Sequence, residues 1–247
     1  MNVFEKHGIT HLSPSSLRLY REEPAAWCIR YLLRVKDEAG PGAWRGQAVE
    51  VGLDRVLYGQ PDDANKAMLD EFEKRAAGVA DDKTEAERAD LPAFLAQAKL
   101  ALAKAEMPLT RQTKISIDLP GIEVPVIGYV DYEWPDYGLD LKTTRRMPSQ
   151  PDPSHVEQVA VYSHAKGKPF SLLYVTPKKY AVYPVTSDMA DAAMVRVRRG
   201  AAALRSLLAR CDSGEDALSI FSPDMASYHW SPEMVTAAKR IYDGAPA

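Results

Sequence analysis

Residues 128–144 of this 247-residue chain read GYVDYEWPDYGLDLKTT. The stretch holds two runs rich in Val, Tyr, Trp and Leu, which is typical of strands, and a PDYG segment between them, which is typical of a turn. Charged side chains normally avoid such runs, yet Asp131, Asp140 and Lys142 lie inside them. These three charges therefore indicate either an ion pair at a sheet edge or a functional site.

The turn decides which side chains share a face of the predicted hairpin. If Pro135 pairs with Gly138, then Asp131 faces Lys142 across the two strands. Side chains two residues apart point to the same face, so Asp131, Asp140 and Lys142 project from one side of the hairpin. The leucines between them point to the other side, into a core. A register shift of one residue would separate the three charges.

Two carboxylates on one partly buried surface repel each other, and burial increases the cost of each charge. A divalent cation bound by Asp131 and Asp140 would remove both difficulties, and hard oxygen ligands suit Mg²⁺ or Mn²⁺ rather than zinc. A salt bridge between Asp131 and Lys142 at a sheet edge explains the hairpin equally well. The hairpin alone leaves both interpretations open.

Two predicted helices supply further polar residues at helical spacing. Glu50 heads an apolar stripe that Leu53 and Leu57 continue, so its carboxylate either completes a metal site or lies at the edge of the stripe. Gln158 and Tyr162 share a helix face because they are four residues apart. They are either part of the same site or a surface amide beside a half-buried tyrosine.

Helical and strand-like segments alternate along the rest of the chain. Ser13 and Pro14 mark the start of a helix that is interrupted near Pro24. We expect further helices over residues 43–59, 154–167 and 188–210, two polar helices between 61 and 105, and strands over 113–119, 122–134, 137–143, 170–176 and 180–185. Ser154 and Glu157 are spaced as a capping box. One α/β domain with helical additions is the simplest account.

The overall composition, 46% hydrophobic and 26% charged, is that of an ordinary soluble globular protein. No apolar run approaches the ~20 residues of a membrane span, and the N-terminus lacks the apolar segment of a signal peptide. Cys28 and Cys211 form no CxxC pair, so we expect a reducing cytoplasm and neither a disulfide framework nor a thiolate zinc site. Residues 142–210 carry twelve basic and four acidic side chains, which favours a polyanionic partner.

Three short motifs follow one another in the chain: Asp131, then Asp140-Leu141-Lys142, then Gln158-x-x-x-Tyr162. Together they resemble the PD-(D/E)XK nuclease superfamily and, more narrowly, its RecB-like and phage-exonuclease branch. The segment SPSSLRLYREEPAAWCIRYL, residues 13–32, is similar to the N-terminal helix of that branch, although Glu23 stands where the branch has a cysteine before proline. The resemblance covers residues 11–186.

The resemblance implies an α/β fold with a restriction-endonuclease-like αβββαβ core, in which helices flank a mixed central sheet. We expect a single nuclease domain over residues 1–247. Its core would span about 43–186, its N-terminal helices 13–36 and its C-terminal helical extension 187–247. Iron–sulfur clusters occur in many RecB-like relatives, but they need four thiolates and this chain has two cysteines, so we expect none.

The resemblance also implies a role for each residue of the motifs. The metal ligands would be Glu50, Asp131, Asp140 and the main-chain carbonyl of Leu141. Lys142 would orient or polarise the attacking water and stabilise the negative charge that develops on phosphorus oxygens, which is where hydrolysis needs it. Gln158 and Tyr162 would position the substrate strand.

Further residues are expected to contact the DNA backbone. Free N–H groups at the helix start favour an anion near Ser13, Ser15 and Ser16. Four arginines are candidates for further phosphate contacts: Arg18, Arg21, Arg145 and Arg146. The glycine-rich segment GPGAWRG, residues 40–46, lacks the Gly-Lys-Ser/Thr of a P-loop, so we expect no bound nucleotide.

The leading hypothesis is a Mg²⁺-dependent DNA exonuclease of the phage-recombination type that acts on duplex ends. The first alternative is a structure-specific or nicking DNA endonuclease of the same fold. The second, from another class, is a non-catalytic nucleic-acid-binding protein, although binding alone does not need Asp131, Asp140 and Lys142 together. The resemblance further allows a homo-oligomer and a single-strand annealing or recombination partner protein.

Overall fold

The computed structural model describes residues 1–36 and 39–242. Its centre is a mixed sheet of five strands in the order β1 (Thr110–Ile117), β2 (Val126–Glu133), β3 (Gly138–Thr143), β4 (Phe170–Val175) and β5 (Tyr180–Pro184). β3 and β4 are parallel, and α7 (Pro153–Lys166) connects them, whereas the other neighbouring strands are antiparallel. With α4 (Pro41–Leu57) before β1, these elements follow the predicted αβββαβ order. The α/β fold class is therefore confirmed.

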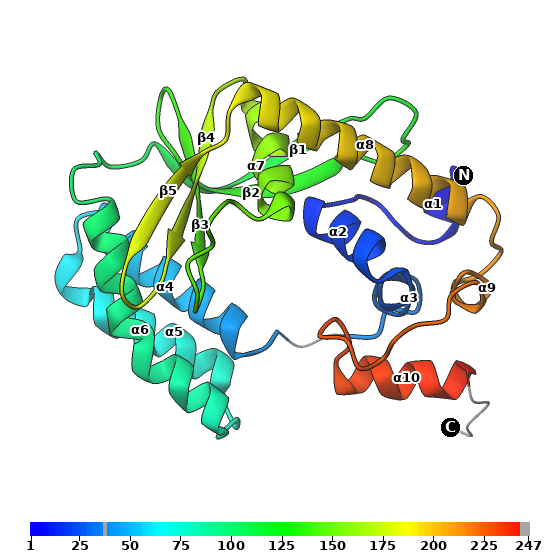
Figure 1. Ribbon diagram of the computed structural model, residues 1–247, viewed down its shortest axis with the longest axis horizontal. Helices are drawn as coiled ribbons and strands as arrows, with labels where there is room; N and C mark the ends of the chain where they lie inside the picture. The colour runs from blue at the N-terminus through cyan, green and yellow to red at the C-terminus, as the bar shows by residue number, and fades with distance from the viewer. Residues whose placement is uncertain (37–38, 243–247) are drawn as a thin grey trace.

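Helices cover both faces of the sheet (Figure 1). On one face, α4 packs with α5 (Ala64–Ala76) and α6 (Asp82–Ala101) over a core that includes Leu139, Leu141 and Leu173. On the other face, α7 packs with α2 (Pro14–Glu22) and α8 (Ser187–Leu208) over a second core that includes Val130 and Leu172. Leu172 and Leu173 are adjacent in β4 and serve opposite cores, as the alternation of a strand requires.

The chain ends extend the second core. α1 (Val3–Lys6), α3 (Pro24–Trp27), α9 (Gly214–Ser219) and α10 (Pro232–Tyr242) contribute buried residues to it, and a π-helical turn (Cys28–Leu32) follows α3. Pro24 begins α3, so the predicted interruption is confirmed. A single domain over residues 1–247 stays a prediction, and its end at 243–247 lies outside the described residues. Within residues 1–36 and 39–242, no helix combines the length and apolar character needed to cross a membrane.

The structure confirms the predicted cap of one helix and contradicts that of another. The Ser13 side chain accepts a hydrogen bond from the Ser16 N–H (3.1 Å), so Ser13 caps α2 as predicted. The predicted capping box of Ser154 and Glu157 is wrong, because α7 begins at Pro153, two residues earlier than a cap at Ser154 would allow. Asp152 is the N-cap instead, and its carboxylate accepts the Ser154 N–H at 2.8 Å. Glu157 is buried elsewhere in an ion-pair network.

The predicted hairpin register is also wrong, by two residues. Gly138 pairs with Glu133 rather than Pro135, and the connection is a four-residue loop in which the Trp134 N–H bonds to the Tyr137 carbonyl at 2.8 Å. Extending this register brings Asp131 opposite Asp140. Because the shift is an even number of residues, the predicted face of each side chain is preserved.

Candidate active site

Asp140 and Lys142 form the centre of the candidate site on β3. The Asp140 side chain is fully buried, and Lys142 Nζ lies 2.7 Å from its Oδ2. Neither oxygen of Asp140 accepts a hydrogen bond of normal geometry from the residues that the structure describes. Burial raises the pKa of Asp140 against the opposing effect of Lys142. Burial lowers the pKa of Lys142, but Asp140 and Asp131 outweigh it and the pKa is raised, so Lys142 is a cation at neutral pH.

Asp131 and Glu50 add two carboxylates next to this pair. Asp131 Oδ2 accepts the main-chain N–H of Leu141 at 2.8 Å, which ties β2 to β3 at the site. Burial, then Asp140 and Glu50, raise the pKa of Asp131 well above its ordinary value. Burial and Asp140 likewise raise the pKa of Glu50, although the Gln112 amide, Lys142 and a nearby arginine oppose them. The three carboxylates therefore lie close enough to repel one another.

Gln158 and Tyr162 reach the site from α7. Gln158 Oε1 accepts a hydrogen bond from Lys142 Nζ at 3.0 Å, and its Nε2 lies 2.6 Å from the Tyr162 hydroxyl. Burial raises the pKa of Tyr162, so its hydroxyl is neutral. A Cβ at Gly128, the first residue of the quoted stretch, would lie 2.6 Å from Tyr162 Cε1, so glycine is required there for the ring to reach the site.

A hollow of about 400 Å³ opens in front of these residues. It is lined by residues of β1, β2 and α7 and by the start of α2: His11, Ser13, Pro14, Ser15, Gln112, Ile127, Gly128, Tyr129, Asp131, Gln158 and Tyr162. Ser13 and Ser15 thus face the same space as Asp131. Ser16 is buried instead and is used in the α2 cap. The helix start and the charged hairpin, more than 100 residues apart in sequence, meet at one hollow.

The donor set fits a hard divalent cation in its chemistry. Asp140 is a buried carboxylate whose oxygens accept no hydrogen bond of normal geometry from the described part of the chain, and Asp131 and Glu50 are carboxylates that repel it. Among the described residues, however, no three His, Cys, Asp or Glu side chains are already arranged as a set that could hold a metal. The Gln112 amide joins Glu50 to Asp131 in this structure. Binding by all three carboxylates would therefore require their side chains to move.

Comparison with known proteins identifies the family. A sequence model described as the PD-(D/E)XK nuclease superfamily matches residues 11–222. The chain belongs to the PD-(D/E)XK nuclease superfamily. No curated protein matches the chain. Among solved structures, one titled "Crystal structure of SSO0001" is 16% identical, with 62% of this chain and 73% of that chain covered and a TM-score of 0.32, and this low similarity carries no argument.

Membership in the PD-(D/E)XK superfamily implies that the chain is a nuclease enzyme, that nucleic acid is its substrate class, and that divalent metals such as Mg²⁺ or Mn²⁺ serve it. The match extends beyond the 11–186 span expected from sequence, into α8 and α9. It does not distinguish the RecB-like branch from others. The roles of individual residues stay predictions.

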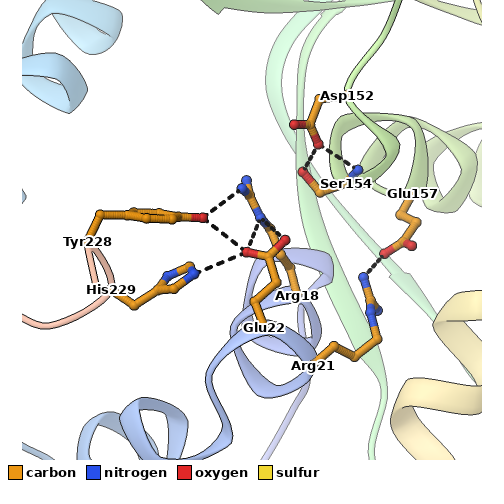
Figure 2. A network of polar contacts seen from close by, with 8 residues as sticks. All are labelled: Arg18, Arg21, Glu22, Asp152, Ser154, Glu157, Tyr228 and His229. Carbon is orange, nitrogen blue, oxygen red and sulfur yellow. Dashed lines mark hydrogen bonds and ion pairs between the residues drawn. The ribbon is translucent and has the colours of Figure 1, made fainter. Parts of the chain in front are cut away.

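Three of the four predicted DNA-contacting arginines are engaged in ion pairs. Figure 2 shows Arg18 bound through Nε to both oxygens of Glu22 (3.0 and 2.9 Å), with its Nη2 3.3 Å from the Tyr228 hydroxyl. His229 lies 3.3 Å from the same Glu22 carboxylate. The loop before α10 therefore covers the end of Arg18. Arg18 can reach a phosphate only if these contacts open.

Arg21 and Arg145 are held by buried carboxylates. Arg21 pairs with Glu157, which also lies 2.9 Å from Arg196 Nε (Figure 2 shows the Arg21 contact). Arg145 pairs with Glu87 and with Asp90 on α6. Arg21 therefore fastens α2 to α7, and Arg145 fastens the segment after β3 to α6. Their formal charge is largely neutralised at the surface.

Arg146 has a different environment from the other three arginines. It is exposed and lines a hollow of about 520 Å³ with Arg145, Lys178 and Lys179. The two lysines lie in the turn between β4 and β5. The Thr144 N–H bonds to the Val175 carbonyl, so this turn lies beside the end of the strand that carries Lys142. Sequence reasoning missed the two lysines because only the parallel pairing of β3 and β4 brings them here.

His155, on α7, lies near Lys142 of the candidate site. The structure shows it partly buried, with Nδ1 2.7 Å from the Tyr174 hydroxyl, which also accepts the Asp152 N–H at 3.0 Å. Burial first, and then Lys142, lower the pKa of His155 to about 4, although Asp152 opposes them. His155 is therefore neutral at physiological pH and can accept the Tyr174 proton.

This environment makes stability depend on pH. The folded protein binds a proton at His155 with a pKa of about 4, whereas the unfolded chain does so near 6.5. The lowered pKa of His155 therefore contributes to the free energy of unfolding above pH 6.5, and this contribution is lost as pH falls toward 4. In His155→Gln, the free energy of unfolding should decrease about 2–3 kcal/mol less than in the wild type between pH 7 and 4.5. Urea denaturation at both pH values measures this difference. His164→Gln, at an exposed histidine of the same helix, should behave as wild type, and equal pH dependence of all three proteins would contradict the prediction.

Proposed function

We propose that this PD-(D/E)XK nuclease is a Mg²⁺- or Mn²⁺-dependent DNA exonuclease that digests duplex DNA from its ends, as in the phage-recombination type of the RecB-like branch. The observation that carries the proposal is the fully buried Asp140, ion-paired to Lys142, together with the neighbouring carboxylate Asp131, which lines a hollow. Burying such a charged group costs stability, and buried ionisable groups of this kind cluster at functional sites. Hydrolysis of a phosphodiester is a reaction that would use these charges.

Glu50, Asp131, Asp140 and the carbonyl of Leu141 would hold the cation. When bound, the cation would lower the pKa of a water molecule and offset charge on the phosphate. Hydrolysis by a water molecule would break one P–O ester bond and leave a phosphate on one fragment and a hydroxyl on the other. The role of the chain is to bring the scissile phosphate and the water together in a fixed orientation.

Lys142 and its partners would stabilise developing charge and position the substrate strand. Asp140 and Gln158 Oε1 hold Lys142 Nζ from two sides, so its charge is oriented before substrate arrives. A cation fixed in this way stabilises the extra negative charge on the non-bridging oxygens without reorganisation. The neutral Tyr162 hydroxyl, in contact with Gln158, would help to position the substrate strand.

Two surfaces would grip the DNA backbone on either side of this centre. The start of α2 lies at the hollow, but its cap already uses the N–H groups of Ser13 and Ser16, and residue 14 is a proline. The Ser13 and Ser15 hydroxyls and the Ser15 N–H would therefore contact one phosphate there. Arg146, Lys178 and Lys179 would contact phosphates beyond the end of β3. Digestion from an end could be aided by a homo-oligomer or by a single-strand annealing or recombination partner, as in relatives of the phage-exonuclease kind.

The test compares linear duplex DNA with covalently closed circles in Mg²⁺. We expect the linear form to be digested, the circles to be spared, and EDTA to stop the reaction. Digestion should weaken as salt rises, because phosphate contacts release counterions. Asp140→Asn serves as the inactive control, since it removes a charge with little change in volume. Cutting of closed circles would favour the structure-specific or nicking endonuclease, and no hydrolysis of either form would contradict the enzyme itself.

A further inference from the structure

The Gln112 side chain lies between two of the carboxylates at the site hollow. Its Nε2 donates to Asp131 Oδ1 at 3.0 Å and also to Glu50 Oε1. A primary amide carries two N–H groups on one nitrogen, so it can satisfy two acceptors at once. Gln112 is therefore bound to both groups that would have to turn toward a cation. Nothing in the sequence singled it out, because it is one polar residue in a polar run, TRQTK.

The backbone at Gln112 has an unusual conformation that directs the side chain toward Glu50 and Asp131. Its φ is +46°, in the left-handed region that residues other than glycine rarely adopt. The register is continuous on both sides, with Arg111 opposite Tyr132 and Thr113 opposite Val130. Yet Val130 belongs to the core under α7 and Tyr132 to the core under α4, although an ideal strand would point both to the same face. The strands therefore change face at Gln112 and Asp131.

A strained residue persists only where the surrounding structure determines its conformation, and such residues cluster at functional sites. Regular β geometry at position 112 would leave the amide elsewhere and the carboxylates of Glu50 and Asp131 without their shared donor. The two carboxylates repel each other, and the repulsion contributes to the raised pKa of Asp131. The Gln112 amide relieves part of this repulsion with the positive ends of its N–H dipoles.

We propose that Gln112 is an internal stand-in for the divalent cation. Its amide holds Glu50 and Asp131 in the metal-free protein and is displaced when the cation binds. The inference rests on the proposed metal-dependent function. Gln112 thereby lowers metal affinity, because each binding event must first break its two hydrogen bonds, and it keeps the carboxylates oriented while no metal is present. Gln112 is therefore a positioning residue: a ligand raises metal affinity, whereas Gln112 lowers it.

The experiment measures Mn²⁺ binding to metal-free protein by calorimetry, without DNA. Gln112→Gly removes the amide and suits the left-handed backbone, so the fold is not strained by the change. We expect this variant to bind Mn²⁺ about tenfold more tightly than wild type, the order expected for lost hydrogen bonds to charged groups. Gln112→Asn, which tolerates the same backbone but is too short to reach both carboxylates, should also bind more tightly.

Thermal unfolding gives a second readout that a purely structural role would not produce. Without metal, Gln112→Gly should melt below wild type, because Glu50 and Asp131 lose their donor. In saturating Mn²⁺ the difference should shrink, because the amide is displaced in the wild type as well. Ser116→Ala, at an exposed position of the same strand, is the matched control and should change neither quantity.

The outcomes separate the inference from the function on which it rests. If wild type binds Mn²⁺, Asp131→Asn does not, and both Gln112 variants bind no more tightly than wild type, the inference is overturned and the metal site stands. Weaker binding by the Gln112 variants would make the side chain a ligand and also overturn it. A wild type that binds no Mn²⁺ overturns the metal-dependent function and the inference together.

Discussion

Lys142→Ala should slow Mg²⁺-dependent DNA hydrolysis by about 10²–10³-fold, the usual cost of removing one oriented donor from the transition state. Its Nζ lies between Asp140 and Gln158, so its charge has a fixed direction. DNA binding should change little, since most of the affinity for DNA comes from the many phosphate contacts of the surface. Single-turnover digestion of linear duplex at saturating Mg²⁺ measures the rate, and a filter-binding titration in Ca²⁺ measures the affinity.

A second lysine of similar burial provides the control for Lys142. Lys168 lies 2.7 Å from Glu133 on the same sheet, and its side chain is 15% exposed against 20% for Lys142. Its other hydrogen bonds go to the main-chain carbonyls of Trp134 and Pro135, at the loop between β2 and β3. Lys168→Ala should therefore keep the wild-type rate per folded molecule. Lys142→Ala also leaves a cavity beside the buried Asp140, so Lys142→Met, which removes the charge but keeps most of the volume, is a second variant, and circular dichroism establishes that each protein is folded. A wild-type rate in either Lys142 variant would refute the assigned role.

The fold and the shared face of the three charges could be predicted because both depend on periodicity. The αβββαβ order follows from the change between helical and strand periods, and the structure confirms it. The hairpin register depends instead on loop geometry, which adjacent residues do not fix. It shifted by two residues and left Asp131, Asp140 and Lys142 on one face, because the period of a strand is also two.

The partners of charged residues could not be predicted, because they depend on which distant elements meet. Arg21 and Arg146 look alike in the sequence, but Arg21 pairs with a buried glutamate of α7 while Arg146 lines an open basic hollow. Gln112 likewise owes its place to a local change of strand face. Sequence periodicity identifies the face on which a side chain lies. The tertiary packing decides whether its charge is available.

Arg45→Met should lower the free energy of unfolding by about 3–5 kcal/mol, because it leaves a buried carboxylate without its main partner. Arg45 lies on α4, is 6% exposed, and pairs with Glu87 of α6 at 2.6 Å. It also donates to the Thr143 carbonyl at 3.1 Å and to its hydroxyl at 3.2 Å. Urea denaturation at pH 7 measures the loss. Arg55→Met, at an exposed position of the same helix, should cost less than about 1 kcal/mol.

Combining Arg45→Met with Glu87→Leu separates stability from the site. The double variant removes both charges together, so it should recover most of the lost free energy of unfolding, since a buried ion pair is often replaceable by apolar residues. It cannot recover the contact between α4 and Thr143, one residue beyond Lys142. We expect this contact to set the position of Glu50 relative to β3. The double variant should therefore be stable but bind Mn²⁺ more weakly than wild type. Wild-type Mn²⁺ affinity in a stable double variant would show that Arg45 stabilises the fold without positioning Glu50. Weakened affinity would connect the buried ion pair to the metal site through α4, which carries both Arg45 and Glu50.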